Sequence, residues 1–373
     1  MGKKPMYHVN IYHKMHRNRL LAIIAGLCCV LAASPCTSLI ASGSATASGR
    51  PLLWKHRDTS AATNFIHRVE QEGKIGYVGL FNGGDTLALD QAWMGMNDAG
   101  FAIMNTVAYN LPENDPAWID REGYVMAQAL QTCRTVDDFE QLLRRLPRPM
   151  GVRTNFGVID AQGGAAYFET CDYSFVRYDA ADARQGVMVR TNYAYSGTPD
   201  EGMGYIRHQN VVDLLQAQID TGSLTPASLT EGVSRSFYNS LTGFDMAESS
   251  DSWAVDQDFV PRYSSTASIA VEGVLPGETA DAQVMWANIA YPPCSYVVAV
   301  TNSDVPPCVD ATAADGTARA PMAVEAAELK ALVFPVSRGS GSRYINLEAL
   351  RPINEENYQK SLETYSNFRK THK

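Results

Sequence analysis

The feature that most constrains this chain is a cysteine, Cys36, which directly follows a segment with the composition of an export leader. Residues 1–35 contain five basic side chains and no acidic one, and residues 20–33 form an apolar run of 14 residues. A transmembrane helix needs about 20 apolar residues, whereas a run of this length is typical of a signal peptide. We therefore predict that residues 1–35 are a removed signal peptide or leader, that the protein is secreted or periplasmic, and that residues 36–373 form a single folded domain.

The position of the cut leaves two hypotheses open. Residues 32–34 supply the small side chains that a signal peptidase requires, but Pro35 would then follow the cleaved bond, which is unfavourable. A free terminus at Cys36 therefore needs the removal of Pro35, either by a second protease or by the Cys36 thiol itself. In the alternative, residues 33–36 resemble a lipidation site, although a proline stands where glycine or alanine is expected. A lipid anchor would consume the α-amine of Cys36.

The composition excludes several classes of function. Loss of five positive charges with residues 1–35 changes the net charge from −9 to −14, so binding to nucleic acid is not expected. No second apolar stretch reaches spanning length, so stable insertion into a membrane is not expected either. No cysteine or histidine spacing is typical of a zinc site, and neither a metal nor an organic cofactor is predicted. The sequence is compatible with a homo-oligomer and does not fix the oligomeric state.

Five cysteines follow the leader, an odd number that leaves at least one thiol free in an exported protein. They are Cys36, Cys133, Cys171, Cys294 and Cys308. A disulfide between Cys294 and Cys308, which lie in proline-rich segments, is one alternative, and two free thiols are the other.

The pattern of apolar residues predicts strands, then helices, then strands again. The hairpin of residues 37–41 and 52–58, turning at residues 49–51, comes first, and strands 75–81 and 101–107 follow. Helices are expected at 124–132, at 135–146 with Thr135 as N-cap, at 207–219, and after Pro226. Further strands are expected at 155–160, 165–169, 187–193, 264–274, 282–290 and 295–301. Residues 310–321 read as a loop, and the tail, about 354–373, as a helix whose apolar face packs on the core. This order favours an α+β fold with stacked sheets between helical layers.

Cys36 is the residue with the clearest chemical potential. A cysteine at a free N-terminus carries both a nucleophilic thiol and an α-amine that titrates near ~8, so the amine can serve as its base. Lys55 and Asp58 lie at the far end of the returning strand, which a hairpin brings back beside Cys36. A cation there would favour the thiolate, and the carboxylate would hold the amine or thiol in place.

These residues carry a resemblance to known enzymes. Cys36-Thr37, the turn and strand of residues 49–54, and residues 55–58 resemble the start of the cysteine-type N-terminal-nucleophile hydrolases. The penicillin acyl-coenzyme A acyltransferase family, with carcinine hydrolase-like enzymes, is the most similar group, and the choloylglycine hydrolases are more remote. Residues 96–105, 186–193 and 205–207 are similar to later choloylglycine hydrolase motifs, and residues 262–300 to late strands of the acyltransferase group. The resemblance implies a four-layer αββα sandwich over residues 36–373.

The resemblance also implies roles for individual residues. Cys36 would be the nucleophile, and Asp58 the aspartate beside it. Asn105 matches an asparagine of the choloylglycine oxyanion site, and Asn192 matches an asparagine that either binds the oxyanion or orients the amine. Neutral amides can donate hydrogen bonds to a developing negative oxygen without titrating. Arg207 matches an arginine held near the nucleophile. The chain departs from the choloylglycine pattern at Lys55, where arginine is usual and the bidentate fork is lost, and at His56, where asparagine is common.

The expected function is that of an exported amidohydrolase that cleaves a linear, non-peptide C–N amide of a small molecule through an acyl-thioenzyme. Three alternatives stay open at this point. The acyl group could pass to an amine, as in an acyltransferase of the penicillin type, or the substrate could be a conjugated bile salt. The chain could also be a lipid-anchored binding protein that kept the fold and lost the activity.

Overall fold

The computed structural model describes residues 35–117, 120–311, 317–337 and 343–371. The predicted signal peptide, up to residue 34, lies outside these residues. Residues 34–373 form one compact unit. Within the described part of the chain, no helix combines the length and apolar character needed to cross a membrane.

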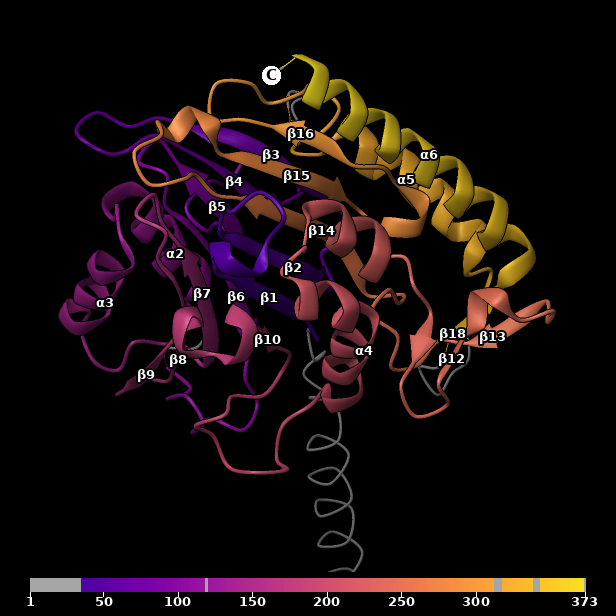
Figure 1. Cartoon of the computed structure of the whole chain (residues 1–373), viewed down its shortest axis with the longest axis horizontal. Helices are drawn as coiled ribbons and strands as arrows, with labels where there is room; N and C mark the ends of the chain where they lie inside the picture. The colour runs from indigo at the N-terminus through magenta and orange to yellow at the C-terminus, as the bar shows by residue number, and fades with distance from the viewer. Residues whose placement is uncertain (1–34, 118–119, 312–316, 338–342, 372–373) are drawn as a thin grey trace, which may run out of the picture. The chain divides into compact units, whose positions relative to one another are not determined.

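Two antiparallel sheets form the centre of the unit (Figure 1). The six-stranded sheet has the order β10-β1-β2-β14-β15-β16, with β1 at Thr37–Ala41, β2 at Leu52–Asp58, β10 at Val187–Arg190, β14 at Ser265–Glu272, β15 at Val284–Ile289 and β16 at Val298–Val300. The seven-stranded sheet runs from β3 to β9 in chain order: Asn64–Val69, Tyr77–Asn82, Met94–Asn97, Ala102–Val107, Thr154–Ile159, Ala165–Thr170 and Phe175–Asp179. Two small sheets lie outside these. One pairs β11 (Tyr238–Asn239) with β12 (Phe244–Asp245), and the other has the order β13 (Trp253–Val255), β18 (Arg343–Asn346) and β17 (Val336–Ser337).

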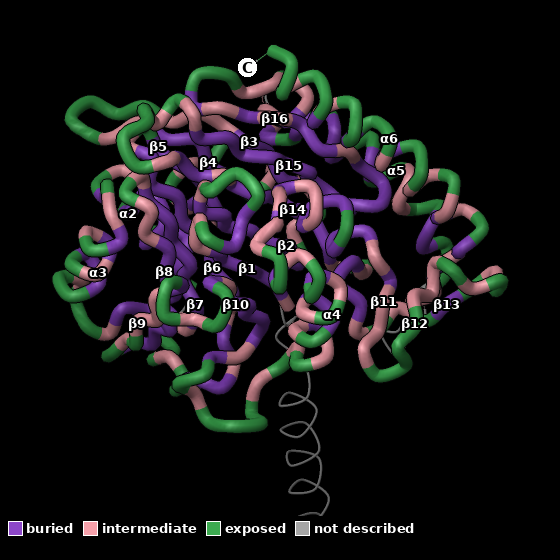
Figure 2. Tube along the Cα trace, viewed as in Figure 1, coloured by how far each residue is buried: buried purple, intermediate pink, exposed green. Residues whose placement is uncertain are grey.

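The side chains of β1 and β2 alternate between the two faces of the six-stranded sheet. Ile40 and Leu53 join the core shared with the seven-stranded sheet, whereas Leu39 and Trp54 belong to a second core on the opposite face. Successive side chains of a strand point to opposite faces, so one hairpin contributes to both cores. Figure 2 shows the buried strands enclosed by helices with exposed outer sides.

Helices cover both outer faces. On the seven-stranded sheet lie α2 (Glu122–Thr132) and α3 (Val136–Arg145), where Phe139 packs edge-on against Phe156 and Phe168. On the six-stranded sheet lie α4 (Tyr205–Thr221) and α6 (Leu347–Thr371), and α5 (Pro321–Val333) packs beside α6. Tyr365 of α6 stacks on Trp286 of β15 with ring centroids 4.3 Å apart. The helix–sheet–sheet–helix order confirms the predicted four-layer α+β sandwich.

Several local predictions are confirmed. β1 and β2 form the expected hairpin, and Thr135 caps α3 through a capping box in which the Thr135 hydroxyl accepts from the Asp138 amide and the Asp138 carboxylate accepts from the Thr135 amide. The tail is helical and its apolar face packs on the core, although α6 begins earlier, at Leu347.

Other boundaries were wrong. The strand predicted at 187–193 ends at Arg190, and beyond it Asn192 pairs with Met203 in an isolated bridge. The strand predicted at 295–301 shortens to Val298–Val300. The helix predicted to begin at Pro226 is confirmed, and it continues as a π-helical turn at Ser228–Val233. The loop predicted at 310–321 ends where α5 begins at Pro321, and its residues 312–316 lie outside the described part.

Candidate active site

The hairpin brings the end of β2 back to Cys36. Thr37 pairs with His56 in the ladder, and the Cys36 thiol donates to the backbone carbonyl of Asp58 at 3.7 Å. Cys36 is buried, with 5% of its surface exposed. The structure therefore places Asp58 directly beside Cys36, as the length of the hairpin predicts.

Arg207 ties the start of β1 to α4 and to Asn192. Its Nη1 donates to the carbonyl of Cys36 and to the hydroxyl of Thr37, both at 2.7 Å, and its Nη2 donates to Oδ1 of Asn192 at 2.8 Å. The approach depends on Gly204, which precedes α4 with φ +86°, because a Cβ there would lie 2.3 Å from Nη2 of Arg207. Burial lowers the pKa of Arg207 to about 9. Three predicted site residues therefore meet through one buried guanidinium.

Asp58 is the centre of a second buried network. Its Oδ2 pairs with Nη2 of Arg262 at 3.0 Å, and its Oδ1 accepts from the Ser265 hydroxyl at 2.6 Å. Burial raises the pKa of Asp58, and the positive charges of Arg262 and Arg207 oppose that rise. Nε2 of His56 lies 2.7 Å from the same serine hydroxyl. Because burial and both arginines lower the pKa of His56 well below its ordinary value, His56 is neutral and donates to Ser265, which in turn donates to Asp58.

Arg262 is a residue that the sequence reasoning missed. Besides pairing with Asp58, its Nη2 donates to the carbonyl oxygen of Pro35 at 3.2 Å. That carbonyl belongs to the peptide bond between Pro35 and Cys36. The Arg262 amide also donates to the Ser265 hydroxyl at 3.0 Å, so Arg262 in the loop before β14 and Ser265 at the start of β14 are joined to each other as well as to Asp58. No spacing in the sequence marks this loop as part of the site.

Lys55 and Asn105 form a third contact group. Nζ of Lys55 donates to Oδ1 of Asn105 at 2.6 Å and to the Trp93 carbonyl at 2.9 Å. Burial lowers the pKa of Lys55 to about 8. The amide nitrogen of Asn105 donates to the Thr154 hydroxyl at 3.3 Å, and that of Asn192 donates to the Val107 carbonyl at 2.9 Å. In this structure both asparagine side chains thus bond to neighbouring protein groups, and their expected oxyanion role stays a prediction.

Cations surround the Cys36 thiol. Lys55, Arg57 and Arg207 all interact electrostatically with it. Arg57 is held by Asn64 and by Asn82, the latter at 2.7 Å, and it lies over the Trp93 ring. Three buried cations therefore lie within electrostatic range of Cys36.

The described residues contain no cluster of histidine, cysteine, aspartate or glutamate that could hold a metal ion. Cys36, Cys133, Cys171, Cys294 and Cys308 all have free thiols in the described part of the chain. Around Cys36 the structure places charged side chains and backbone carbonyl groups.

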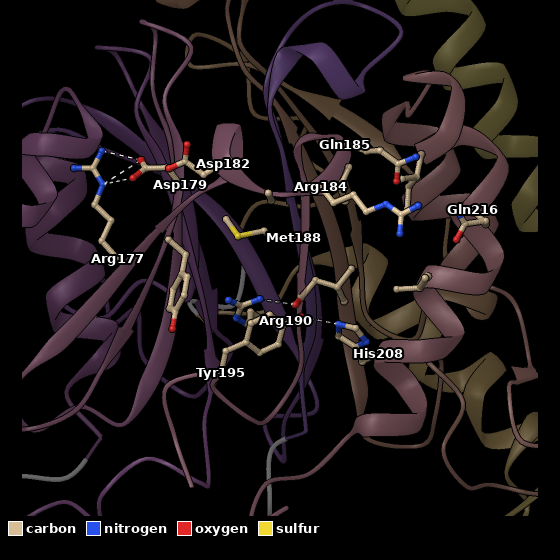
Figure 3. Close-up of a pocket in the computed structure, with 16 residues that line it drawn as sticks. Arg177, Asp179, Asp182, Arg184, Gln185, Met188, Arg190, Tyr195, His208 and Gln216 are labelled. Carbon is tan, nitrogen blue, oxygen red and sulfur yellow. Dashed lines mark hydrogen bonds and ion pairs between the residues drawn. The ribbon is translucent and has the colours of Figure 1, made fainter. Parts of the chain in front are cut away.

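A cavity of about 610 Å³ lies along the free edge of β10 (Figure 3). The end of β9, the residues that follow it and residues of α4 form its walls. Its polar groups are largely engaged: Nε of Arg190 donates to Glu169 at 2.8 Å beneath the Tyr195 ring, and the Tyr195 hydroxyl lies 3.2 Å from Nε2 of His208. Cys36 does not line this cavity.

Comparison with known proteins gives structural neighbours only. No family model and no curated protein sequence matches the chain. A conjugated bile acid hydrolase from Clostridium perfringens aligns at 13% identity and TM-score 0.45, covering 72% of this chain and 93% of that one. Penicillin V acylase from Agrobacterium tumefaciens aligns at 13% identity and TM-score 0.38, covering 72% and 87%. The Caenorhabditis elegans ortholog of N-acylethanolamine-hydrolyzing acid amidase aligns at 15% identity and TM-score 0.36, covering 50% and 84%. These names fall in the group that the sequence resembles, but likenesses at this level do not define the chemistry of this chain.

Proposed function

We propose that the mature protein is an amidohydrolase whose nucleophile is Cys36 at a free N-terminus, and that it cleaves a linear, non-peptide amide. The observation that carries this proposal is the convergence on one buried cysteine of Asp58, Arg207 and Lys55, with Arg262 on the carbonyl before it. Structural roles alone do not account for so many charged groups buried around one thiol, since burying charge is costly.

The chemistry follows from the two groups on Cys36. The α-amine takes the thiol proton, and the thiolate attacks the carbonyl carbon of the amide. The protonated amine then gives its proton to the leaving nitrogen, the C–N bond breaks, and the acyl group remains on sulfur as a thioester. Water hydrolyses the thioester and regenerates the thiol. Arg207 holds the backbone of Cys36 in place throughout, and Asp58 with Arg262 borders the position of the amine.

The same groups support release of the leader by the chain itself. The Cys36 thiol would attack the carbonyl carbon of Pro35, while Arg262 stabilises the negative charge on the Pro35 oxygen. Breaking the Pro35–Cys36 C–N bond transfers the proline acyl group to sulfur and frees the α-amine of Cys36. Hydrolysis of that thioester leaves a carboxylate on Pro35 and the mature N-terminus. This step removes the difficulty that Pro35 poses for a signal peptidase.

A trapping experiment tests the amidohydrolase proposal. Mature protein is incubated with N-acyl amino acids, conjugated bile salts and simple N-acyl amines, and amide cleavage and intact protein mass are followed together. We expect cleavage of at least one class with a transient mass increase equal to the acyl group, and neither effect in a Cys36→Ala variant. An added amine acceptor would reveal acyl transfer by the formation of a new amide. Cleavage by the Cys36→Ala variant at the wild-type rate would overturn the proposal.

A further inference from the structure

A second cavity, of about 260 Å³, lies next to Ser265, the residue that donates to Asp58. Alanines of α5 form one wall, and the space is open past Ala327 and Ala331, which are exposed. The other wall is aromatic. The lining consists of Ala62, Tyr263, Ser265, Ala290, Tyr291, Ala323, Ala326, Ala327, Lys330, Ala331 and Phe334. The small alanine side chains leave room that larger residues would fill.

Lys330 places an ammonium group at this cavity. Its Nζ donates one long hydrogen bond, 3.5 Å, to the Ser265 carbonyl, and it lies 4.7 Å from the Tyr263 ring centroid and 5.5 Å from that of Tyr291. An ammonium group has three donor hydrogens, so this geometry leaves donor capacity toward the cavity. Burial lowers the pKa of Lys330 to about 8, and because this value is still above neutral pH, the amine is mainly protonated there.

Tyr291 supplies a second donor. It is 1% exposed and lines the cavity, yet its hydroxyl has no hydrogen-bond partner among the residues that the structure describes. A buried hydroxyl without a partner is unfavourable. The residue before it, Ala290, has φ +80°, a conformation that alanine rarely adopts, and its amide is held by the Thr266 carbonyl at 2.6 Å. Such strained positions concentrate at functional sites.

The local charge favours an anion. Lys330 interacts with the carboxylates of Asp58 and Asp256, while Arg262 pairs with Asp58 and Arg343 lies 4.2 Å from the centroid of the Tyr263 ring. Three cations and two carboxylates therefore belong to the network around Lys330, and Lys330 is the one among them that lines the cavity. Two unused donors, an excess of positive charge and aromatic walls together fit a small molecule with an apolar body and one negative group that accepts hydrogen bonds.

We propose that this cavity is a binding site for a small carboxylate, held by Lys330 and the Tyr291 hydroxyl. Lys330 is one hydrogen bond from Ser265 and hence two from Asp58, so a carboxylate bound to Lys330 is three hydrogen bonds from Asp58. The carboxylate comes either from the amide substrate itself or from a separate carboxylate molecule. Binding of a separate carboxylate molecule does not depend on the proposed amidohydrolase function, and it can be measured without any turnover.

Calorimetric titration of the full mature protein with benzoate tests the site, and benzamide, which has nearly the same shape but no charge, is the matched ligand. We expect benzoate to bind about tenfold or more tightly than benzamide, because a hydrogen bond to a charged group is lost in the amide. Lys330→Met and Tyr291→Phe should each weaken benzoate binding, the former by about tenfold or more. Lys360→Met is the control, since Lys360 also lies over a tyrosine ring, that of Tyr296, but outside the cavity.

Competition separates the two sources. If the carboxylate belongs to the substrate, benzoate competes with hydrolysis of N-acyl amino acids, and Lys330→Met raises KM for these but not for their carboxamides. If it is a separate ligand, benzoate binds without competing. The site is refuted if benzamide binds as tightly as benzoate, if folded Lys330→Met and Tyr291→Phe proteins both bind benzoate like wild type, or if wild type binds none. Absence of all amide cleavage would refute the proposed function and leave the binding result standing.

Discussion

Replacement of Arg262 by methionine probes the residue that joins Asp58 to the Pro35 carbonyl. The Nη2 atom lies 3.2 Å from the Pro35 oxygen and 3.0 Å from Oδ2 of Asp58, whose side chain is fully buried. Loss of one oxyanion donor costs about 3–4 kcal/mol in the transition state, so self-cleavage should slow by ~10²–10³-fold. Leaving Asp58 without its partner should also lower the free energy of unfolding by about 3–5 kcal/mol.

The two effects can be separated by a double-mutant cycle. Asp58→Asn removes the buried charge, so Arg262→Met in that background should cost little stability. Full-length chains are synthesised in vitro, and loss of residues 1–35 is followed by intact mass over time. If Arg262 acts on the Pro35 oxygen, Arg262→Met still slows cleavage by about 10²-fold in the Asp58→Asn background. If the two backgrounds differ, and Arg262→Met has no effect on cleavage once Asp58 is neutral, the oxyanion role of Arg262 is wrong.

Three further predictions concern the nucleophile, a buried lysine and the tail. Cys36→Ser, supplied with its leader already removed, should lose nearly all amide turnover, since a hydroxyl ionises far less readily than a thiol at neutral pH; retained turnover would count against the mechanism. Because the pKa of Lys55 is about 8 rather than about 10.5, the unfolded chain binds more protons between these values, and this side chain should add about 2–3 kcal/mol of stability from pH ~7 to ~10. The unfolding free energy of wild type, relative to that of Lys55→Met, should therefore rise by about 2–3 kcal/mol between pH ~7 and ~10. A difference between the two proteins that does not change with pH would contradict this. Tyr365→Ala should lower the free energy of unfolding in denaturant by about 3–5 kcal/mol, because it removes the stack on Trp286. Tyr365→Phe should lower it by about 1 kcal/mol, because only the hydrogen bond with Thr230 is lost. Equal losses in the two variants would be inconsistent with the packing role.

The parts of the fold that depend on local sequence could be predicted. The β1–β2 hairpin has its own turn and alternation, and α3 has a capping box within four residues. By contrast, α5 shows no clear period, because its alanines are small enough for several faces, and its start at Pro321 follows a segment that reads as a loop. Helices and strands without a local signal form because distant parts of the chain bury them.

The residues of the site also fall into two groups: those that the local sequence predicts and those that depend on contacts between distant parts of the chain. Lys55 and Asp58 were predictable because they lie on β2, which pairs with the strand that begins directly after Cys36. Arg262 was not, because it reaches Pro35 across 227 positions of sequence, through the pairing of β14 with β2. The bonds of Asn105 to Lys55 and Thr154 were likewise hidden, since they depend on how the two sheets stack. Sequence pattern indicates which residues could react, whereas their partners come from long-range pairing.

The central claim is that Cys36 becomes a free N-terminus and acts as a nucleophile. The most direct test is the intact mass and N-terminal sequence of the protein expressed with its full leader, compared with a Cys36→Ala variant. We expect wild type to lose residues 1–35 and to begin with an unmodified cysteine, while Cys36→Ala retains Pro35. A wild-type protein that keeps Pro35, or that carries a lipid on Cys36, would contradict the claim.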